Sequence, residues 1–180
     1  KLGVIYSADV NKMGRELQSL RIDGVPGHDE SFYKHCGVCA EDESFYGAAL
    51  SREVPVDFPV SGANKIEIVA MKLDGFPPRA ALWKPEGGEV ESLQEFIGGP
   101  QFMREEAAYL LDRAMKFRMV PVAYTAYLDG EFGAALAYSN GNQPAEDANT
   151  YSDVWVQRAA VLDYVMGNTD RHRGNWLTHA

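Results

Sequence analysis

The feature of the sequence that most constrains the fold is a pair of predicted β-hairpins with one predicted helix between them. The first hairpin is expected from two candidate strands, Lys65–Ala70 and Arg79–Lys84, with a turn signal at Asp74-Gly75 between them. The first of these runs begins by alternating apolar and polar residues, which is typical of a strand with one buried face. An Asp-Gly pair between two such runs favours a hairpin. The sequence therefore predicts two antiparallel strands in this region.

A helix and a second hairpin follow in the sequence. Apolar residues recur at helical spacing over Phe102–Lys116, which predicts a helix. Val120–Tyr127 and Phe132–Tyr138 read as strands around a turn at Asp129-Gly130. Pro85–Gly99, between the first hairpin and the helix, reads as a Gly-rich acidic loop.

The last part of the chain continues the pattern with another helix. Ser152-Asp153 can cap a helix that runs to about Met166. Gly167–Gly174 is expected to be a loop, and Asn175–Thr178 to start a strand. The resulting order, β–β–α–β–β–loop–α–loop, predicts an α+β fold.

The first 60 residues have a different character. The pentapeptide Asp-Glu-Ser-Phe-Tyr occurs twice, at Asp29–Tyr33 and Asp42–Tyr46, which is a local duplication rather than a repeat architecture. Pro55 and Pro59 then interrupt the chain, so a boundary is expected near Ser61. We expect residues 1–60 to form an N-terminal appendage or arm and residues 61–180 to form the main domain.

Composition limits the partners that this chain can have. It holds 26 acidic residues against 17 Lys and Arg, a net charge of −9, which argues against general binding to nucleic acid or to an anionic membrane. No apolar run approaches the roughly 20 residues of a membrane helix, and the start of the chain does not resemble a signal peptide. We expect a cytoplasmic or virion-associated protein.

The two cysteines leave alternatives open. Cys36 and Cys39 lie near His28 and His35, and these four side chains are of the type that binds Zn²⁺. The compact spacing favours two thiols without a ligand role over a zinc site, because structural zinc sites usually have two separated halves. A redox pair is the third alternative.

The segment Gly167–Asn175 carries the residues best suited to chemistry. Phosphoryl transfer needs a carboxylate near the attacking hydroxyl and an oxygen ligand for Mg²⁺. Asp170 and Asn175, five positions apart on one loop, can supply both, and His172 or Arg171 can steady the loop or the transferring phosphate. The alternative is a surface turn held by an ion pair.

This segment resembles a known family. Asn-x-Asp-Arg-His-x-x-Asn is similar to the catalytic loop of the phosphatidylinositol 3/4-kinase-like superfamily, which includes lipid kinases and bacterial protein-kinase-like branches. The resemblance implies ATP and Mg²⁺ as cofactors. It makes Asp170 the catalytic base, His172 a further catalytic residue and Asn175 the metal ligand, with Asn168 shaping the loop.

Upstream residues resemble the same family in the same order. Ala80–Pro85, followed by Gly87-Gly88-Glu89, resembles a bacterial "strand, Lys-Pro, Gly-Glu" element. The resemblance places Lys84 against nucleotide phosphates within a kinase-like N-lobe. It makes Glu105 the residue that pairs with Lys84 and orients it.

Two alternatives stay open for this pair of residues. Lys84 can be a solvated lysine at a strand end, and Glu105 is hard to distinguish from the adjacent Glu106. Gly62-Ala63-Asn64 resembles part of a nucleotide-covering loop.

One departure from the family pattern leaves two functional hypotheses open. The family has a second metal-binding Asp on a strand after the catalytic loop, and the sequence stops at Ala180 before such a residue. We expect the chain, which starts at Lys1, to be part of a longer product. The first hypothesis is a phosphotransferase acting on a protein or small-molecule hydroxyl. The alternative is a catalytically inactive kinase-like scaffold within a larger assembly such as a phage particle.

Overall fold

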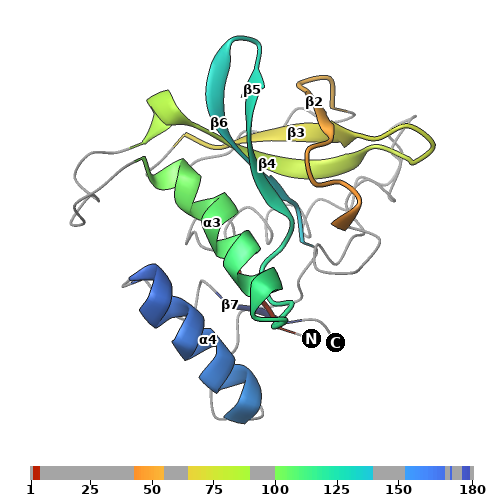
Figure 1. Cartoon of the computed structure of the whole chain (residues 1–180). Helices are drawn as coiled ribbons and strands as arrows, with labels where there is room; N and C mark the ends of the chain where they lie inside the picture. Colours follow the sequence, from red (N-terminus) through yellow and green to blue (C-terminus); the bar gives the residue numbers. More distant parts are fainter. Residues whose placement is uncertain are drawn as a thin grey trace, which may run out of the picture.

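The structure, a computed structural model, combines a curled antiparallel sheet with helices in an α+β fold (Figure 1). The sheet has five strands in the order β2-β3-β4-β6-β5. The structure describes residues 2–4, 43–54, 65–89, 100–139, 153–168, 171 and 176–178.

Four of the five strands of the sheet lie close to where the sequence predicts them, and β2 is a strand that the sequence analysis does not predict. Its strands are β2 (Ala49–Ser51), β3 (Glu67–Lys72), β4 (Arg79–Pro85), β5 (Ala123–Leu128) and β6 (Glu131–Ala137). β3 pairs with β4 and β5 with β6, both antiparallel, so the two predicted hairpins are confirmed. β4 and β6 then pair with each other and join the hairpins into one sheet.

Two α-helices are present among the residues that the structure describes, and one of them packs on the sheet. They are α3 (Gln101–Ala114) and α4 (Asp153–Met166). α3 packs on β5 and β6, and α4 packs on α3, away from the sheet (Figure 1). A single 3₁₀ turn, η2 (Glu86–Gly88), opens the segment expected to be a loop. None of the described helices has the length and apolar character that crossing a membrane requires.

The largest fully buried side chains come from both the sheet and α3. Trp83, Met71 and Leu82 come from the sheet, and Phe102 comes from the first turn of α3. Phe45, which precedes β2, is also fully buried in this cluster. Its burial removes apolar surface from water, which is the main favourable contribution to folding.

The segment before the expected boundary near Ser61 takes part in this sheet. β2 pairs with β3 in antiparallel register, with Leu50 opposite Met71. A further pair of short strands joins β1 (Leu2–Val4) to β7 (Trp176–Thr178), again antiparallel. Residues 5–42 and 55–64 lie outside the described part of the chain, and the separate N-terminal arm stays a prediction.

The sheet curls enough to bring its two edge strands into contact through side chains. β2 and β5 are at opposite ends of the strand order, yet the Tyr124 hydroxyl on β5 donates to the carbonyl oxygen of Ala48 beside β2 at 2.7 Å. Arg52, which follows β2, reaches Asp129 in the β5–β6 turn at 2.6 Å. Such contacts between the two edges require a curled sheet.

The end of α3 explains why β5 begins later than the sequence predicts. The buried Asp112 carboxylate accepts hydrogen bonds from the backbone N–H of Met119 at 2.9 and 3.1 Å. Lys116 and Arg118 adopt left-handed backbone conformations, with φ of 57° and 55°. This held turn lies directly before Val120, and pairing with β6 begins only at Ala123, so the strand starts there rather than at Val120.

Candidate functional site

Lys84 and Glu105 form an ion pair between β4 and α3. The Lys84 ammonium contacts the Glu105 carboxylate directly. Their side chains are 11% and 10% exposed. Charges buried to this degree are tolerated when they are paired, because desolvation of a lone ion is costly. The structure thus brings together the two residues that the resemblance links, and it places Lys84 inside the fold rather than in solvent.

The adjacent Glu106 has different partners. Its carboxylate accepts hydrogen bonds from the Thr125 backbone N–H at 3.0 Å and the Thr125 hydroxyl at 2.6 Å. The Tyr46 hydroxyl donates to its other oxygen. Successive helical residues point about 100° apart, so one glutamate faces β4 while the next faces β5. Glu105 is therefore the partner of Lys84.

The start of α3 is capped by a residue outside the helix. Pro100, at the N-cap position, makes no side-chain capping bond. Glu89 instead accepts hydrogen bonds from the backbone N–H groups of Gln101, at 3.0 Å, and Phe102. A carboxylate is favourable there because the first N–H groups of a helix are unsatisfied and carry partial positive charge. The Gly-Gly-Glu element thus anchors the helix that holds Glu105.

Two glycines allow close backbone approach beside Lys84. A Cβ on Gly133 of β6 would lie 2.5 Å from the Lys84 carbonyl oxygen and 2.8 Å from the Trp83 ring. A Cβ on Gly88 would lie 2.6 Å from the Cβ of Lys65. Both distances are too short for real contacts, so a side chain at either position would displace its neighbours. The close approach of β6 to Lys84 therefore depends on Gly133, and that of the 3₁₀ turn to Lys65 depends on Gly88.

The end of α4 has the hydrogen bonds of a Schellman motif. The N–H of Asn168 donates to the carbonyl oxygen of Asp163 at 2.8 Å, and the N–H of Gly167 donates to that of Tyr164 at 3.2 Å. Gly167 takes the left-handed conformation, φ 60°, that this motif requires. Arg104 of α3 adds hydrogen bonds to the carbonyl oxygens of Met166 and Gly167.

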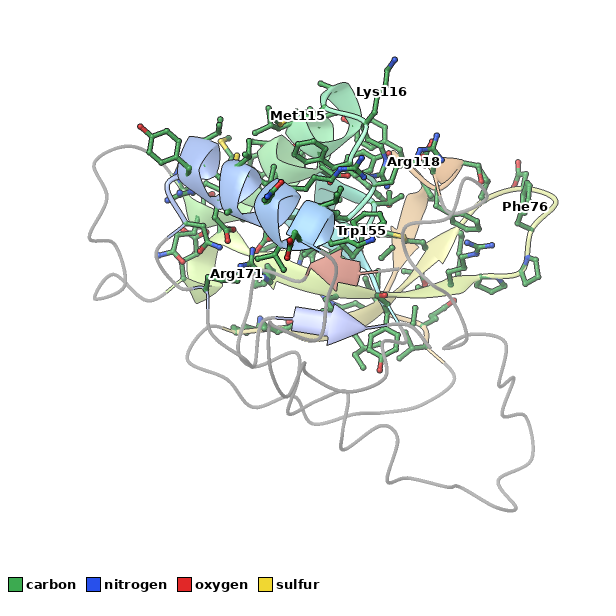
Figure 2. All side chains as sticks on the ribbon, turned by 90° about the horizontal axis from the view of Figure 1, so that it is seen from below. Phe76, Met115, Lys116, Arg118, Trp155 and Arg171 are labelled. Carbon is green, nitrogen blue, oxygen red and sulfur yellow. The ribbon has the colours of Figure 1, made fainter. Side chains whose placement is uncertain are left out.

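Asp163 holds the beginning of the candidate catalytic loop. Its carboxylate accepts a hydrogen bond from the Asn168 side-chain amide at 2.8 Å and pairs with the Arg171 guanidinium, with Nε at 2.7 Å. Arg171 lies beside α4 (Figure 2). Asn168 and Arg171 are therefore both bound by Asp163, a residue that the sequence analysis does not single out, and the role of Asn168 in shaping the loop stays a prediction.

The other candidate residues lie outside the part of the chain that the structure describes. These are Asp170, His172 and Asn175, together with Gly62–Asn64 and the four possible zinc ligands His28, His35, Cys36 and Cys39. Their roles stay predictions. Within the described ranges, no group of three or more His, Cys, Asp or Glu side chains is arranged to hold a metal ion.

The sequence and structure were compared with known proteins. No protein-family model, curated protein or solved structure matches this chain. The kinase-like interpretation therefore depends on the motif residues and on the geometry around Lys84 and Glu105.

Sequence reasoning missed three contacts that organise the site, those of Glu89, Arg104 and Asp163. The contacts of Glu89 and Arg104 join residues distant in the chain through backbone groups, and those of Asp163 join side chains across a helix end, so periodicity does not reveal them. One signal was present: a Gly directly after a helix is typical of a helix C-terminus whose carbonyls need partners.

Proposed function

We propose that this chain is a kinase-like phosphotransferase domain that binds Mg²⁺–ATP and acts on a protein or small-molecule hydroxyl. The observation that carries the proposal is the buried ion pair between Lys84 on β4 and Glu105 on α3. In protein kinases, a strand lysine held by a helix glutamate contacts the nucleotide phosphates. The strand–strand–helix–strand–strand order around this pair supports the same interpretation.

Each candidate residue has a distinct task in this proposal. Lys84 binds phosphate oxygens, and Glu105 fixes the direction of its ammonium group. Asp170 receives the proton of the acceptor hydroxyl, and Asn175 contributes an oxygen ligand to Mg²⁺. Mg²⁺ held there would supply positive charge to neutralise the phosphates. The protein contributes mainly position and fixed charge, because this transfer needs little covalent chemistry from the enzyme.

The Lys84–Glu105 pair suits this task physically. Both groups are almost fully shielded, so their attraction is screened less by water and salt than that of a surface pair. A lysine held in one orientation loses less conformational freedom when a phosphate binds. The Glu89 cap and the close approach at Gly133 hold the two elements that carry the pair.

The test is Mg²⁺–ATP binding measured by calorimetry. We expect the wild-type chain to bind, and Lys84→Met to weaken binding about 10- to 100-fold, because a hydrogen bond to a charged group contributes about 1.5–3 kcal/mol. Lys72→Met is the matched control: Lys72 also lies on a strand of the same sheet, but its pair with Glu53 is exposed. It should bind as the wild type does.

A second variant separates folding from binding. Lys84→Met alone leaves a buried carboxylate unpaired, which can cost about 3–5 kcal/mol. Lys84→Met/Glu105→Leu removes both charges, and such apolar replacement is often neutral for stability. We expect this double variant to fold and to lose nucleotide affinity. A folded wild-type chain that fails to bind at millimolar Mg²⁺–ATP would contradict the proposal and favour the inactive scaffold.

A further inference from the structure

The duplicated pentapeptide Asp-Glu-Ser-Phe-Tyr has no part in the proposed nucleotide site. The structure describes four residues of its second copy, Glu43–Tyr46, and Phe45 is the most deeply buried of them. Its ring meets the edge of Phe76 at 5.8 Å between centroids, and the Arg79 guanidinium lies 4.4 Å from its centroid. Phe45 is therefore the central anchor of this segment, because a fully buried aromatic ring contributes much of the energy of a contact.

The next residue, Tyr46, is bound on its ring and on its hydroxyl. The ring stacks on Tyr109 of α3 at 5.5 Å between centroids and meets Tyr124 of β5 at 5.8 Å. The hydroxyl donates a hydrogen bond to Glu106. A residue with both an apolar ring and a polar tip fits this position, and Tyr46 is the second anchor.

The third anchor is Glu43, at the start of the described part of this copy. Its carboxylate pairs with Arg113 of α3 at 3.0 Å and with Arg118 at 3.5 Å. The surface thus binds an acidic residue followed, two positions later, by Phe-Tyr. We call it the pentapeptide surface; it is formed by Phe76, Arg79, Glu106, Tyr109, Arg113, Arg118 and Tyr124.

The first copy of the pentapeptide has the same residue at every anchor. Glu30, Phe32 and Tyr33 correspond to the three anchors of the second copy. Asp29–Tyr33 lies outside the described part of the chain, and its sequence alone gives it these side chains. A surface that binds one copy through side chains offers the same contacts to the other.

The residues that follow each copy give the second one the advantage. Gly47 has a left-handed backbone with φ of 77°, which glycine adopts without strain. The corresponding residue after the first copy is Lys34, which is strained in that conformation. Farther on, Leu50 of β2 corresponds to Gly37, which has no side chain to pack. Glu43–Tyr46 is therefore the preferred occupant.

We propose that the pentapeptide surface is a recognition site for Glu-Ser-Phe-Tyr, and that Asp29–Tyr33 is a second ligand that competes with Glu43–Tyr46 for it. Exchange of the copies changes how the edges of the sheet are held. Arg52 follows Tyr46 by six positions, and Cys39 follows Tyr33 by the same interval. Binding of the first copy therefore removes the Arg52 guanidinium from its carboxylate partners, such as Asp129.

The test is a double-mutant cycle on the full chain, measured by denaturant unfolding. Its variants are Phe45→Ala, Phe32→Ala and the two combined. Phe32→Ala alone should leave the unfolding equilibrium constant within about twofold of the wild type, because the second copy still occupies the surface. In the Phe45→Ala chain, Phe32→Ala should raise that constant at least about tenfold, because the surface then loses its remaining ligand.

The sign of the coupling separates competition from direct contact. If the two rings touched, Phe32→Ala would cost less in the Phe45→Ala chain than in the wild type, whereas competition makes it cost more. Phe58→Ala is the control, because Phe58 belongs to neither copy and should act equally in both chains. An equal or smaller effect of Phe32→Ala in the Phe45→Ala chain would overturn the proposal. Phe45→Leu, which keeps more of the buried volume, gives the same cycle if Phe45→Ala does not fold.

Lys34→Gly tests the backbone preference with the same measurement. In the Phe45→Ala chain it should lower the unfolding equilibrium constant about fivefold, because glycine lets the first copy follow the left-handed path without strain. In the wild type, and in the chain with both phenylalanines replaced, its effect should stay within about twofold. Failure to stabilise the Phe45→Ala chain would overturn the competition. None of these measurements involves a nucleotide, so their outcome is independent of the proposed function.

Discussion

Three hydrogen-bond donors converge on the carboxylate of Glu106. Burial alone would raise the pKa of this group, but the hydrogen bonds from Thr125 and Tyr46 outweigh it and lower the pKa below its ordinary value of 4.5. The same contact acts on its partner. The hydrogen bond to Glu106, followed by burial, raises the pKa of Tyr46 to about 12. Tyr46 thus stays a donor over the whole neutral range.

Glu106 should therefore make stability depend on pH in the acid range. Because its pKa is lower in the folded than in the unfolded chain, its contribution is present above about pH 4.5 and is lost as pH falls through the lowered folded-state pKa. We expect Glu106→Gln to lower the free energy of unfolding at pH 7. The difference from the wild type should shrink as the pH drops below 4.5.

Denaturant unfolding at several pH values measures this difference. Glu53→Gln serves as the control, because the Glu53 side chain is 90% exposed and its removal should leave the pH profile unchanged. A difference for Glu106→Gln that stayed constant down to pH 3 would contradict the assigned hydrogen bonds.

At the residue scale, the sequence points to Lys84 and Glu105 but not to the residues that contact them. Resemblance to the kinase-like family indicates both residues, whereas the helical pattern does not distinguish Glu105 from Glu106. The two glutamates differ in the strand that each contacts: Glu105 contacts β4, and Glu106 contacts β5. These strands are distant in sequence. Spacing along one helix does not contain that information.

Both described α-helices end with the same hydrogen-bond motif but with different residues. At the end of α4, Gly167 occupies the left-handed position. At the end of α3, Lys116 occupies it, with the N–H of Phe117 donating to the Asp112 carbonyl oxygen at 3.0 Å. Lys116 points away from the rest of the molecule (Figure 2). A side chain with a Cβ is strained in this conformation, whereas glycine is not.

Exchanging these residue types should change stability in opposite directions. Lys116→Gly should raise the free energy of unfolding by about 0.5–1 kcal/mol, as relief of backbone strain exceeds the added entropy of the unfolded chain. Gly167→Ala should lower it by about 1 kcal/mol or more, because alanine introduces that strain beside Arg104. Thermal and denaturant unfolding of the two variants provide the measurement. Stabilisation by Gly167→Ala would show that the motif at α4 is misassigned.

At the level of elements, local signals predicted most of what the structure describes. Asp-Gly turns and apolar alternation located both hairpins, and helical periodicity located α3 and α4. The strand β1 and its pairing with β7 were not anticipated, because that pairing joins opposite ends of the sequence. The start of β5 was misplaced because a buried carboxylate, invisible to periodicity, holds the preceding turn.

Across the whole molecule, Arg52 links parts of the sheet that are far apart in strand order. Its guanidinium pairs with Glu67 on β3 at 2.8 Å, and with Asp129 and Glu131 at the β5–β6 turn at 2.6 and 3.0 Å. Three carboxylates around one fork of donors form a network rather than an isolated surface pair. This network holds the curled shape of the sheet.

Removal of this network should lower the free energy of unfolding modestly, by an amount that depends on salt concentration. Arg52→Ala should lower the free energy of unfolding by about 1 kcal/mol at low ionic strength, since the group is one-third exposed and screened. The loss should shrink in 1 M salt, where the Debye length falls to about 3 Å. Lys72→Ala, which removes one exposed pair, should cost less. An effect of Arg52→Ala that does not respond to salt would point to packing instead.

For the whole molecule, the sequence predicted an α+β fold and one half of the candidate site. The half around Lys84 can be described in atomic terms because strand and helix patterns are strong there. The half around Asp170 follows from motif resemblance alone, and the functional assignment of both halves is a proposal. Long-range contacts, such as those of Arg52 and Arg104, require three-dimensional packing that no local pattern encodes.

The bond from Thr125 to Glu106 also bears on how the chain avoids self-association. β5 is an edge strand, and a free backbone N–H on such a strand is a template for adding a strand from another molecule. At Thr125 that N–H is already taken by a carboxylate from α3, and a carboxylate cannot continue a ladder of strands. The opposite edge, β2, is only three residues long, too short to recruit a partner readily. The same glutamate that contacts this strand from α3 thus removes one of the donors that an added strand would need at this edge.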